Sequence, residues 1–215
     1  MQIEVWSDVI CPWCYIGKRK LEMALAKFPH WEQVQVVWRS YELDPDAPRQ
    51  PTGTLNEMLA QKYDVSLAEA AAMNARVTAA AREVGLDYQL ERARPGNTLD
   101  AHRLLHFAAA RQLGDVASER LMRGYFSESL PVGDREALAR LAPEFGIPQH
   151  EARALLESDA YTEAVRADEA RAADFGITGV PCFVIDESIV IAGAQPVEVF
   201  ADTLRQAWQE SRGGA

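Results

Sequence analysis

Cysteine is scarce in this chain: its 215 residues include only Cys11, Cys14 and Cys182. A small secreted protein stabilised by disulfides would carry more cysteines, in an even number. The count therefore argues against a disulfide-stabilised secreted fold. Two cysteines separated by two residues, in a chain that does not use disulfides to fold, are more often catalytic or metal-binding.

Long apolar runs are also lacking. No segment approaches the roughly 18 consecutive apolar residues that a membrane span requires. A secretory signal begins with basic residues and continues with an apolar run. Here Met1 to Trp6 has the pattern of a strand, and Asp8 interrupts the next apolar stretch. We therefore expect a cytoplasmic protein that does not associate with membranes.

The sequence also lacks an excess of positive charge. The sequence holds 22 lysines and arginines against 32 aspartates and glutamates, which gives a net charge of -10. Such a chain repels phosphate backbones, so we expect no nucleic-acid partner. Its 48% hydrophobic and 25% charged residues are typical of a globular protein whose core is large enough to fold without disulfides.

Strand patterns occur at the two ends of the chain. A strand over 3–7 precedes a helix with Leu21, Leu25 and Phe28 on one face, and a second strand follows over 33–39. A strand, a helix and a strand within so few residues indicate a right-handed parallel unit.

The C-terminal end repeats the mixture of strand and helix. Strands over 182–185 and 189–192 flank a short polar turn, which predicts a hairpin, and a last helix is expected over about 197–210. Neither end is large enough to bury a core alone. Together they predict a four-stranded sheet, and the fold class is α/β.

The middle of the chain has a helical character, rich in alanine, glutamate, arginine and leucine. Glycine and proline breaks divide it into roughly five or six helices, and one helix should begin at Asn97, with Asp100 completing a near capping box. We therefore predict a discontinuous domain over 1–53 and 176–215, and an inserted all-helical domain over 54–175.

The strongest chemical signal is Cys11-Pro12-Trp13-Cys14. Pro12 suits the first position of a helix, which places Cys11 at or next to the N-cap, where free N–H groups and the helix dipole stabilise a thiolate. Cys14 lies one turn deeper and is placed to resolve a mixed disulfide. Half a zinc site or two inert thiols are the alternatives, but the sequence offers no second pair of ligands at zinc spacing.

A second signal is Val180-Pro181, directly before the strand that begins at Cys182. A proline that opens a strand beside an active site is either trans or cis. The backbone of Val180 could pair with an extended peptide substrate. The apolar surroundings of Cys182 favour a buried, inert thiol, with a third ligand or redox partner as the alternative.

Other candidates have simpler explanations beside the functional ones. His102 and His106 lie four residues apart, as in some metal sites, although a packed or solvent-facing pair is the simpler interpretation. Trp13 is either a substrate-facing platform or a packed aromatic residue. The remaining tryptophans are expected in the core: Trp6, Trp31, Trp38 and Trp208.

Three segments together resemble proteins of the DsbA superfamily of the FrnE type. The segment 8–17 resembles the start of those proteins, 176–181 resembles their cis-proline segment, and 97–104 resembles part of their inserted helical domain. The resemblance implies a thioredoxin-like fold with a large helical insertion. It further implies thiol–disulfide exchange with Cys11 as nucleophile, a cis Pro181 facing the cysteines, and His102 lining the cleft opposite Cys11.

The same superfamily includes kappa-class glutathione transferases and 2-hydroxychromene-2-carboxylate isomerases. They resemble this chain in outline but carry serine where Cys11 stands, and serine cannot form a disulfide. One departure concerns Val5, because thioredoxin and DsbA carry a buried acid six residues before the first cysteine. Asp8 and water are therefore the candidates for carrying the proton of Cys14.

The sequence thus predicts a protein disulfide oxidoreductase or isomerase that exchanges disulfides with proteins or peptides. The alternatives are a glutathione-linked transferase or isomerase acting on a small molecule, and a zinc-binding or chaperone-like module. We expect no cofactor beyond the Cys11–Cys14 disulfide, glutathione as an alternative co-substrate, and no metal. The predicted substrate-contacting residues are Pro12, Trp13, Val180, Pro181, Asn97 and His102.

Overall fold

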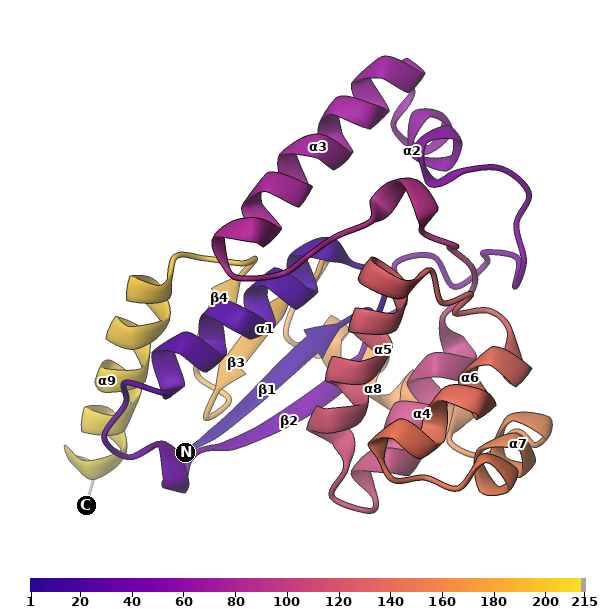
Figure 1. Cartoon of the computed structure of the whole chain (residues 1–215). Coiled ribbons are helices and arrows are strands. Elements are labelled where there is room, and N and C mark those ends of the chain that lie inside the picture. Colours follow the sequence, from indigo (N-terminus) through magenta and orange to yellow (C-terminus); the bar gives the residue numbers. More distant parts are fainter. Residues whose placement is uncertain (214–215) are drawn as a thin grey trace.

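The two ends of the chain meet in one four-stranded sheet, as seen in a computed structural model that describes residues 1–213 (Figure 1). The strand order is β2-β1-β3-β4; β1 runs parallel to β2 and antiparallel to β3, and β3 and β4 form the predicted hairpin. The parallel unit at the N-terminus is therefore confirmed. The strands are β1 (Gln2–Ser7), β2 (Gln35–Ser40), β3 (Cys182–Ile185) and β4 (Ile189–Ala192).

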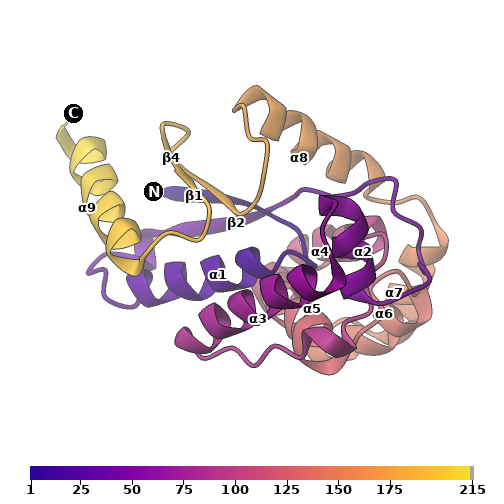
Figure 2. The same ribbon diagram turned by 90° about the horizontal axis from the view of Figure 1, so that it is seen from above.

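Both faces of the sheet are covered by helices (Figure 2). Alternating residues of a strand point to opposite faces. Ile3 and Val5 of β1 therefore pack in the cluster that contains Leu21 of α1 (Pro12–Leu25) and Leu204 of α9 (Val197–Gly213). Trp6 packs on the other face against α8 (Thr162–Asp174), and its indole N–H donates to the Asp168 carbonyl oxygen at 2.8 Å.

The segment between β2 and β3 is helical, as predicted, but holds seven α-helices within the described residues where five or six were expected. Two divisions have no glycine or proline to signal them, that of α2 from α3 and that of α7 from α8. Capping boxes start α2 and α3, at Thr54 with Glu57 and at Ser66 with Glu69. The block consists of α8 and of the six helices before it: α2 (Leu55–Tyr63), α3 (Leu67–Glu83), α4 (Leu99–Ala109), α5 (Gly114–Glu128), α6 (Arg135–Leu141) and α7 (Gln149–Glu157).

The predicted start of α4 is wrong in detail. Thr98, not Asn97, is the N-cap residue, and its side chain makes no capping bond; the Asn97 side chain accepts from the Leu99 N–H, the first N–H of the helix. The Asp100 carboxylate instead binds Arg103 at 2.7 Å and Arg135 at 2.8 Å in a buried cluster. Because Arg49 Nη2 also lies 3.2 Å from Asp100 Oδ2, three arginines bind this carboxylate. Trp31 also departs from its prediction, because it is 58% exposed.

The helical block and α1 share one hydrophobic core. Cys14, Tyr15 and Ile16 on α1 belong to the same buried cluster as Tyr88 and Phe126 of the block. The division at residues 53 and 176 therefore stays a prediction, because the first turns of α1 pack as closely with the block as with the sheet. None of the helices in the described residues is long and apolar enough to cross a membrane.

A buried carboxylate anchors the α8 face of the sheet. Glu4 of β1 is 1% exposed and accepts hydrogen bonds from Arg39 Nε at 2.8 Å and from Arg171 Nη2 at 2.7 Å. Burial by itself would raise the pKa of Glu4, but the bonds from Arg171 and Arg39 outweigh it and lower the pKa below its usual value.

Replacing Glu4 by glutamine therefore tests this anchor. A carboxyl whose folded-state pKa is lowered stabilises the fold above its unfolded-state pKa, and this contribution disappears as the pH falls through the folded-state value. We expect Glu4→Gln to lower the free energy of unfolding at neutral pH by roughly 1–3 kcal/mol. The wild type should also lose more stability than the variant on acidification below about pH 4.

Urea denaturation at several pH values measures both effects. Glu187→Gln is the matched control, because Glu187 also binds Arg171 but its side chain is 66% exposed, and exposed pairs contribute little. The interpretation fails if Glu4→Gln shows the same pH dependence as the wild type.

Candidate active site

The helix start brings the two cysteines together at the end of β1. Cys11 is the N-cap residue of α1 in an extended conformation, and Pro12 occupies the first turn, as the sequence predicted. The N–H of Cys11 donates to the Asp8 carbonyl oxygen at 3.1 Å, and the N–H of Cys14 donates to the Cys11 carbonyl oxygen at 3.0 Å. These bonds fix both thiols on a single turn of backbone.

The two thiols occupy different environments, although neither is open to solvent. Cys11 is 4% exposed and Cys14 is 1% exposed, so Cys11 is less exposed than the sequence suggested. Cys11 nevertheless lines a cleft of about 960 Å³, whereas Cys14 lies behind it. Access to the pair from this cleft is therefore through Cys11.

Burial and the neighbouring Cys11 raise the pKa of the Cys14 thiol well above its usual value. Hydrogen bonds available from the Asp8 N–H and the Ser7 hydroxyl oppose this effect in part. Cys14 therefore keeps its proton at neutral pH, as the deeper thiol of the pair was expected to.

The loop before β3 lies directly against the cysteine turn. The Val180–Pro181 peptide bond is cis, and the Cys11 thiol donates to the Val180 carbonyl oxygen at 3.5 Å. A Cβ atom on Gly17 would lie 3.1 Å from Cγ of Pro181 and 3.1 Å from Cζ of Phe183. The absence of a side chain at Gly17 thus lets α1 approach this loop closely.

The cleft beside Cys11 lies between the start of α1, the loop at 43–47 and the helices α2 and α3. Its walls are mainly apolar, and Trp13, which is 45% exposed, forms part of them. A cleft of this size and character is typical of sites for organic ligands or peptide side chains. Apolar side chains from the two helices line it: Leu55, Met58, Leu59, Met73 and Val77.

Tyr88 is a site residue that the sequence did not indicate. Its hydroxyl donates to the Pro12 carbonyl oxygen at 2.7 Å, and its ring stacks on Phe126 with centroids 4.5 Å apart. Burial and the nearby Cys11 raise the pKa of Tyr88, so the phenol stays neutral and can donate. Because Tyr88 is separated from the cysteines by more than 70 residues, no local motif could have revealed it.

Three of the six predicted substrate-contacting residues do not line the cleft: Pro181, which packs against Gly17, and also His102 and Asn97. His102 does not line the cleft; it is 1% exposed, with Nε2 3.4 Å from Asp8 Oδ1. The Asn97 amide donates to the Pro45 carbonyl oxygen at 2.9 Å, and its oxygen accepts from the Leu99 N–H at 3.1 Å. Asn97 therefore holds the neighbouring loop, and His102 lies beneath the site. By contrast, Pro12, Trp13 and Val180 all line the cleft.

The two histidines of the α4 face have separate partners. His106 Nε2 lies 3.2 Å from Ser40 Oγ and 3.1 Å from Asp168 Oδ2, away from the Asp8 contact of His102. Within residues 1–213, no group of three or more His, Cys, Asp or Glu side chains is arranged to hold a metal ion. The pair therefore has no metal-binding geometry in this part of the chain.

Cys182 lies in a separate apolar cluster with Trp6 and Val184 and is 3% exposed. Burial raises the pKa of its thiol. This environment is that of the inert thiol predicted from the sequence.

Comparison with known proteins gives a match over nearly the whole chain. Residues 2–205 match the family model of the DSBA-like thioredoxin domain. The crystal structure of the probable DsbA oxidoreductase SCO1869 from Streptomyces coelicolor is 44% identical, with a TM-score of 0.93 over 98% of this chain and 91% of that one.

Two more distant structures share the fold. A 2-hydroxychromene-2-carboxylate isomerase is 13% identical, with a TM-score of 0.74 over the full length of both chains. The cytosolic disulfide reductase DsbM from Pseudomonas aeruginosa, solved with GSH, is 18% identical, with a TM-score of 0.63 over 97% of this chain and 100% of that one.

The different environments of the three thiols predict an order of alkylation. At neutral pH in the folded protein, iodoacetamide should modify Cys11 first, because Cys11 alone of the three lines the cleft and the pKa values of Cys14 and Cys182 are raised. Peptide mass spectrometry after timed pulses measures the three rates. The urea-unfolded chain is the control, in which the rates should converge, and faster modification of Cys14 than of Cys11 would reverse the assignment.

Proposed function

We propose that this chain, which belongs to the family of DSBA-like thioredoxin domains, is a thiol–disulfide oxidoreductase with Cys11 and Cys14 as its redox centre. The predicted family and the thioredoxin fold with a helical insertion are both confirmed by the match. The observation that carries the proposal is the asymmetry of the pair: Cys11 lines a cleft at a helix N-terminus, and Cys14 is a protonated thiol behind it.

Each thiol then has one role in the exchange. The Cys11 thiolate attacks one sulfur of a substrate disulfide, and the other substrate sulfur leaves as a thiolate. Cys14 loses its proton and attacks Cys11 Sγ, which breaks the mixed disulfide and releases the second substrate thiolate. The substrate is reduced by two electrons, and the Cys11–Cys14 disulfide forms; the reverse sequence oxidises a dithiol substrate.

The substrates that we favour are proteins or peptides. Val180 lies one residue before Pro181 and outside the paired strands, which begin at Cys182, so its backbone can pair with an extended chain next to Cys11. The apolar walls of the cleft would take side chains that flank the substrate cysteine. The roles of Trp13, Val180 and Pro181 in substrate contact stay predictions, as does the cytoplasmic location.

A second candidate is a reaction with glutathione, alone or with a small molecule. The fold is shared with DsbM, which has been solved with GSH, and with a 2-hydroxychromene-2-carboxylate isomerase. The cleft beside Cys11 is large enough for a tripeptide. Parallel assays of insulin reduction and of glutathione-mixed disulfide reduction would separate the two candidates by their relative kcat/KM.

Serine substitutions test the two cysteine roles. Cys11→Ser should abolish insulin reduction, because no nucleophile remains in the cleft. The Cys14→Ser variant should still attack the substrate through Cys11. It should then accumulate a mixed disulfide with the substrate, since the resolving thiol is gone.

Non-reducing electrophoresis and intact-mass measurement detect the trapped species. Cys182→Ala is the matched control, and most of the activity should remain because this thiol lies outside the cleft. Retained turnover in Cys11→Ser would exclude the proposed centre.

A further inference from the structure

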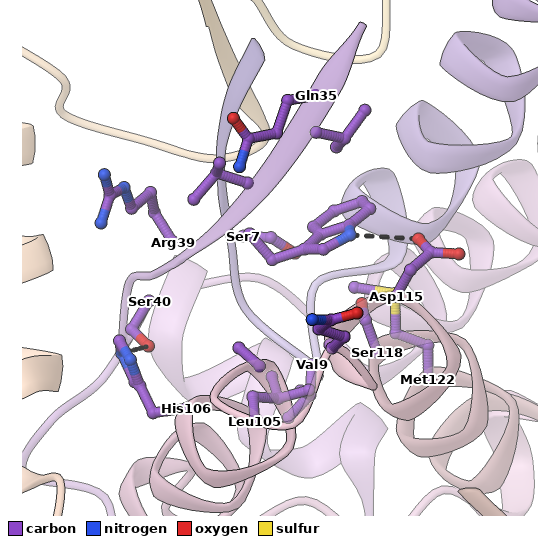
Figure 3. A pocket seen from close by; sticks show the side chains of 16 residues that line it. Ser7, Val9, Gln35, Arg39, Ser40, Leu105, His106, Asp115, Ser118 and Met122 are labelled. Carbon is purple, nitrogen blue, oxygen red and sulfur yellow. Dashed lines mark hydrogen bonds between the residues drawn. The ribbon is translucent and has the colours of Figure 1, made fainter. Parts of the chain in front are cut away.

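A second cavity shares no lining residue with the cleft beside Cys11 (Figure 3). It has a volume of about 350 Å³ and lies between β2 and the helices α4 and α5. Its wall is more apolar than polar, and its polar groups include Ser40, His106 and Ser118. A cavity of this size has room for several water molecules, and these polar groups are available to bind them.

Ser7 is one of the residues that line this cavity. It is the last residue of β1 and is 5% exposed, and its hydroxyl makes no hydrogen bond in the structure. The Ser7 hydroxyl is also among the groups beside Cys14 that favour its thiolate. A buried hydroxyl without a partner is unusual, and this one belongs to a residue that lines the cavity.

The carboxylate of Asp8, the other candidate for the Cys14 proton, is engaged elsewhere. Asp8 Oδ2 accepts from the Leu43 N–H at 2.8 Å, and Oδ1 lies 3.5 Å from the Ile10 N–H and 3.4 Å from His102 Nε2. The group of Asp8 that favours the Cys14 thiolate is its backbone N–H. An N–H group can stabilise the thiolate but cannot accept the proton.

We propose that the Ser7 hydroxyl and water in the cavity behind it carry the proton of Cys14 to and from solvent. The inference rests on the proposed function and concerns its second step. As the Cys14 sulfur attacks Cys11, its proton passes to Ser7 Oγ while the Ser7 proton passes to water. The substrate sulfur leaves with the electron pair of the broken S–S bond, so this second step releases one proton and one thiolate.

Ionisable side chains also surround the proposed proton path, and the test must leave them unchanged. On the cysteine side they are Cys11, Asp8 and Tyr88, and the cavity wall adds Arg39, His106 and Asp115. Because a substitution at Ser7 or Ala109 leaves all of these groups in place, a change in the pH profile of Cys14 can be assigned to the path.

Reaction of the reduced protein with 5,5′-dithiobis(2-nitrobenzoate) separates the two chemical steps. In a Cys182→Ala background, attack by Cys11 releases one coloured thiolate, and attack by Cys14 on the resulting mixed disulfide releases a second. Ser7→Ala should leave the first phase unchanged and slow the second at least about tenfold. The midpoint of its pH profile should also move upward. Ser7→Thr retains a hydroxyl and should restore most of the rate.

A second pair of variants tests the cavity without changing Ser7. Ala109 is exposed and lines the cavity, so Ala109→Phe should fill its mouth and slow the second phase. Ala110→Phe is the matched control, because Ala110 is the next residue along the chain and is also exposed, but it does not line the cavity.

The outcomes distinguish this proposal from the proposed function. A parent protein that releases only one thiolate would overturn the proposed function itself. Two normal phases in the parent and an unchanged second phase in Ser7→Ala would overturn the role of Ser7 alone. An unchanged second phase in Ala109→Phe would overturn the route through the cavity.

Discussion

The contact between α1 and the loop before β3 is the constraint on which the rest of the site depends. Gly17 has no side chain, so Pro181 and Phe183 pack directly against the helix, one turn beyond Cys14. This contact brings the Val180 carbonyl oxygen to 3.5 Å from the Cys11 sulfur. The nucleophile, the backbone that would hold a substrate and the wall of the cleft are therefore positioned by one close approach between two distant parts of the chain.

The helical block completes this arrangement from the other side. The Tyr88 hydroxyl holds the Pro12 carbonyl oxygen, and the aromatic stack of Tyr88 on Phe126 joins that bond to the core of the block. Cys11 lines one cavity and Ser7 lines another, and the two share no lining residue. Substrate and proton would then reach the cysteine pair through different cavities, so a bound substrate need not obstruct the exchange of the proton.

Local signals allowed much of the fold to be predicted, and long-range contacts explain most of the errors. The position of Pro12 in the first turn and the polar turn before Ile189 depend on neighbouring residues alone, and both predictions were confirmed. Asn97 and His102 were misplaced because their partners, Pro45 and Asp8, are more than 50 residues away. The division between α2 and α3 was a local signal that was overlooked, since Ser66 and Glu69 have the spacing of a capping box.

The reduction potential of the Cys11–Cys14 pair tests the central claim most directly. The protein would be equilibrated with glutathione buffers of graded composition, and the dithiol and disulfide forms quantified by acid quenching and mass spectrometry. Because Pro12 and Trp13 place no imidazolium beside the thiolate, the account predicts one two-electron transition between about -120 mV and about -270 mV. A chain that never forms an internal Cys11–Cys14 disulfide across the whole series would contradict it.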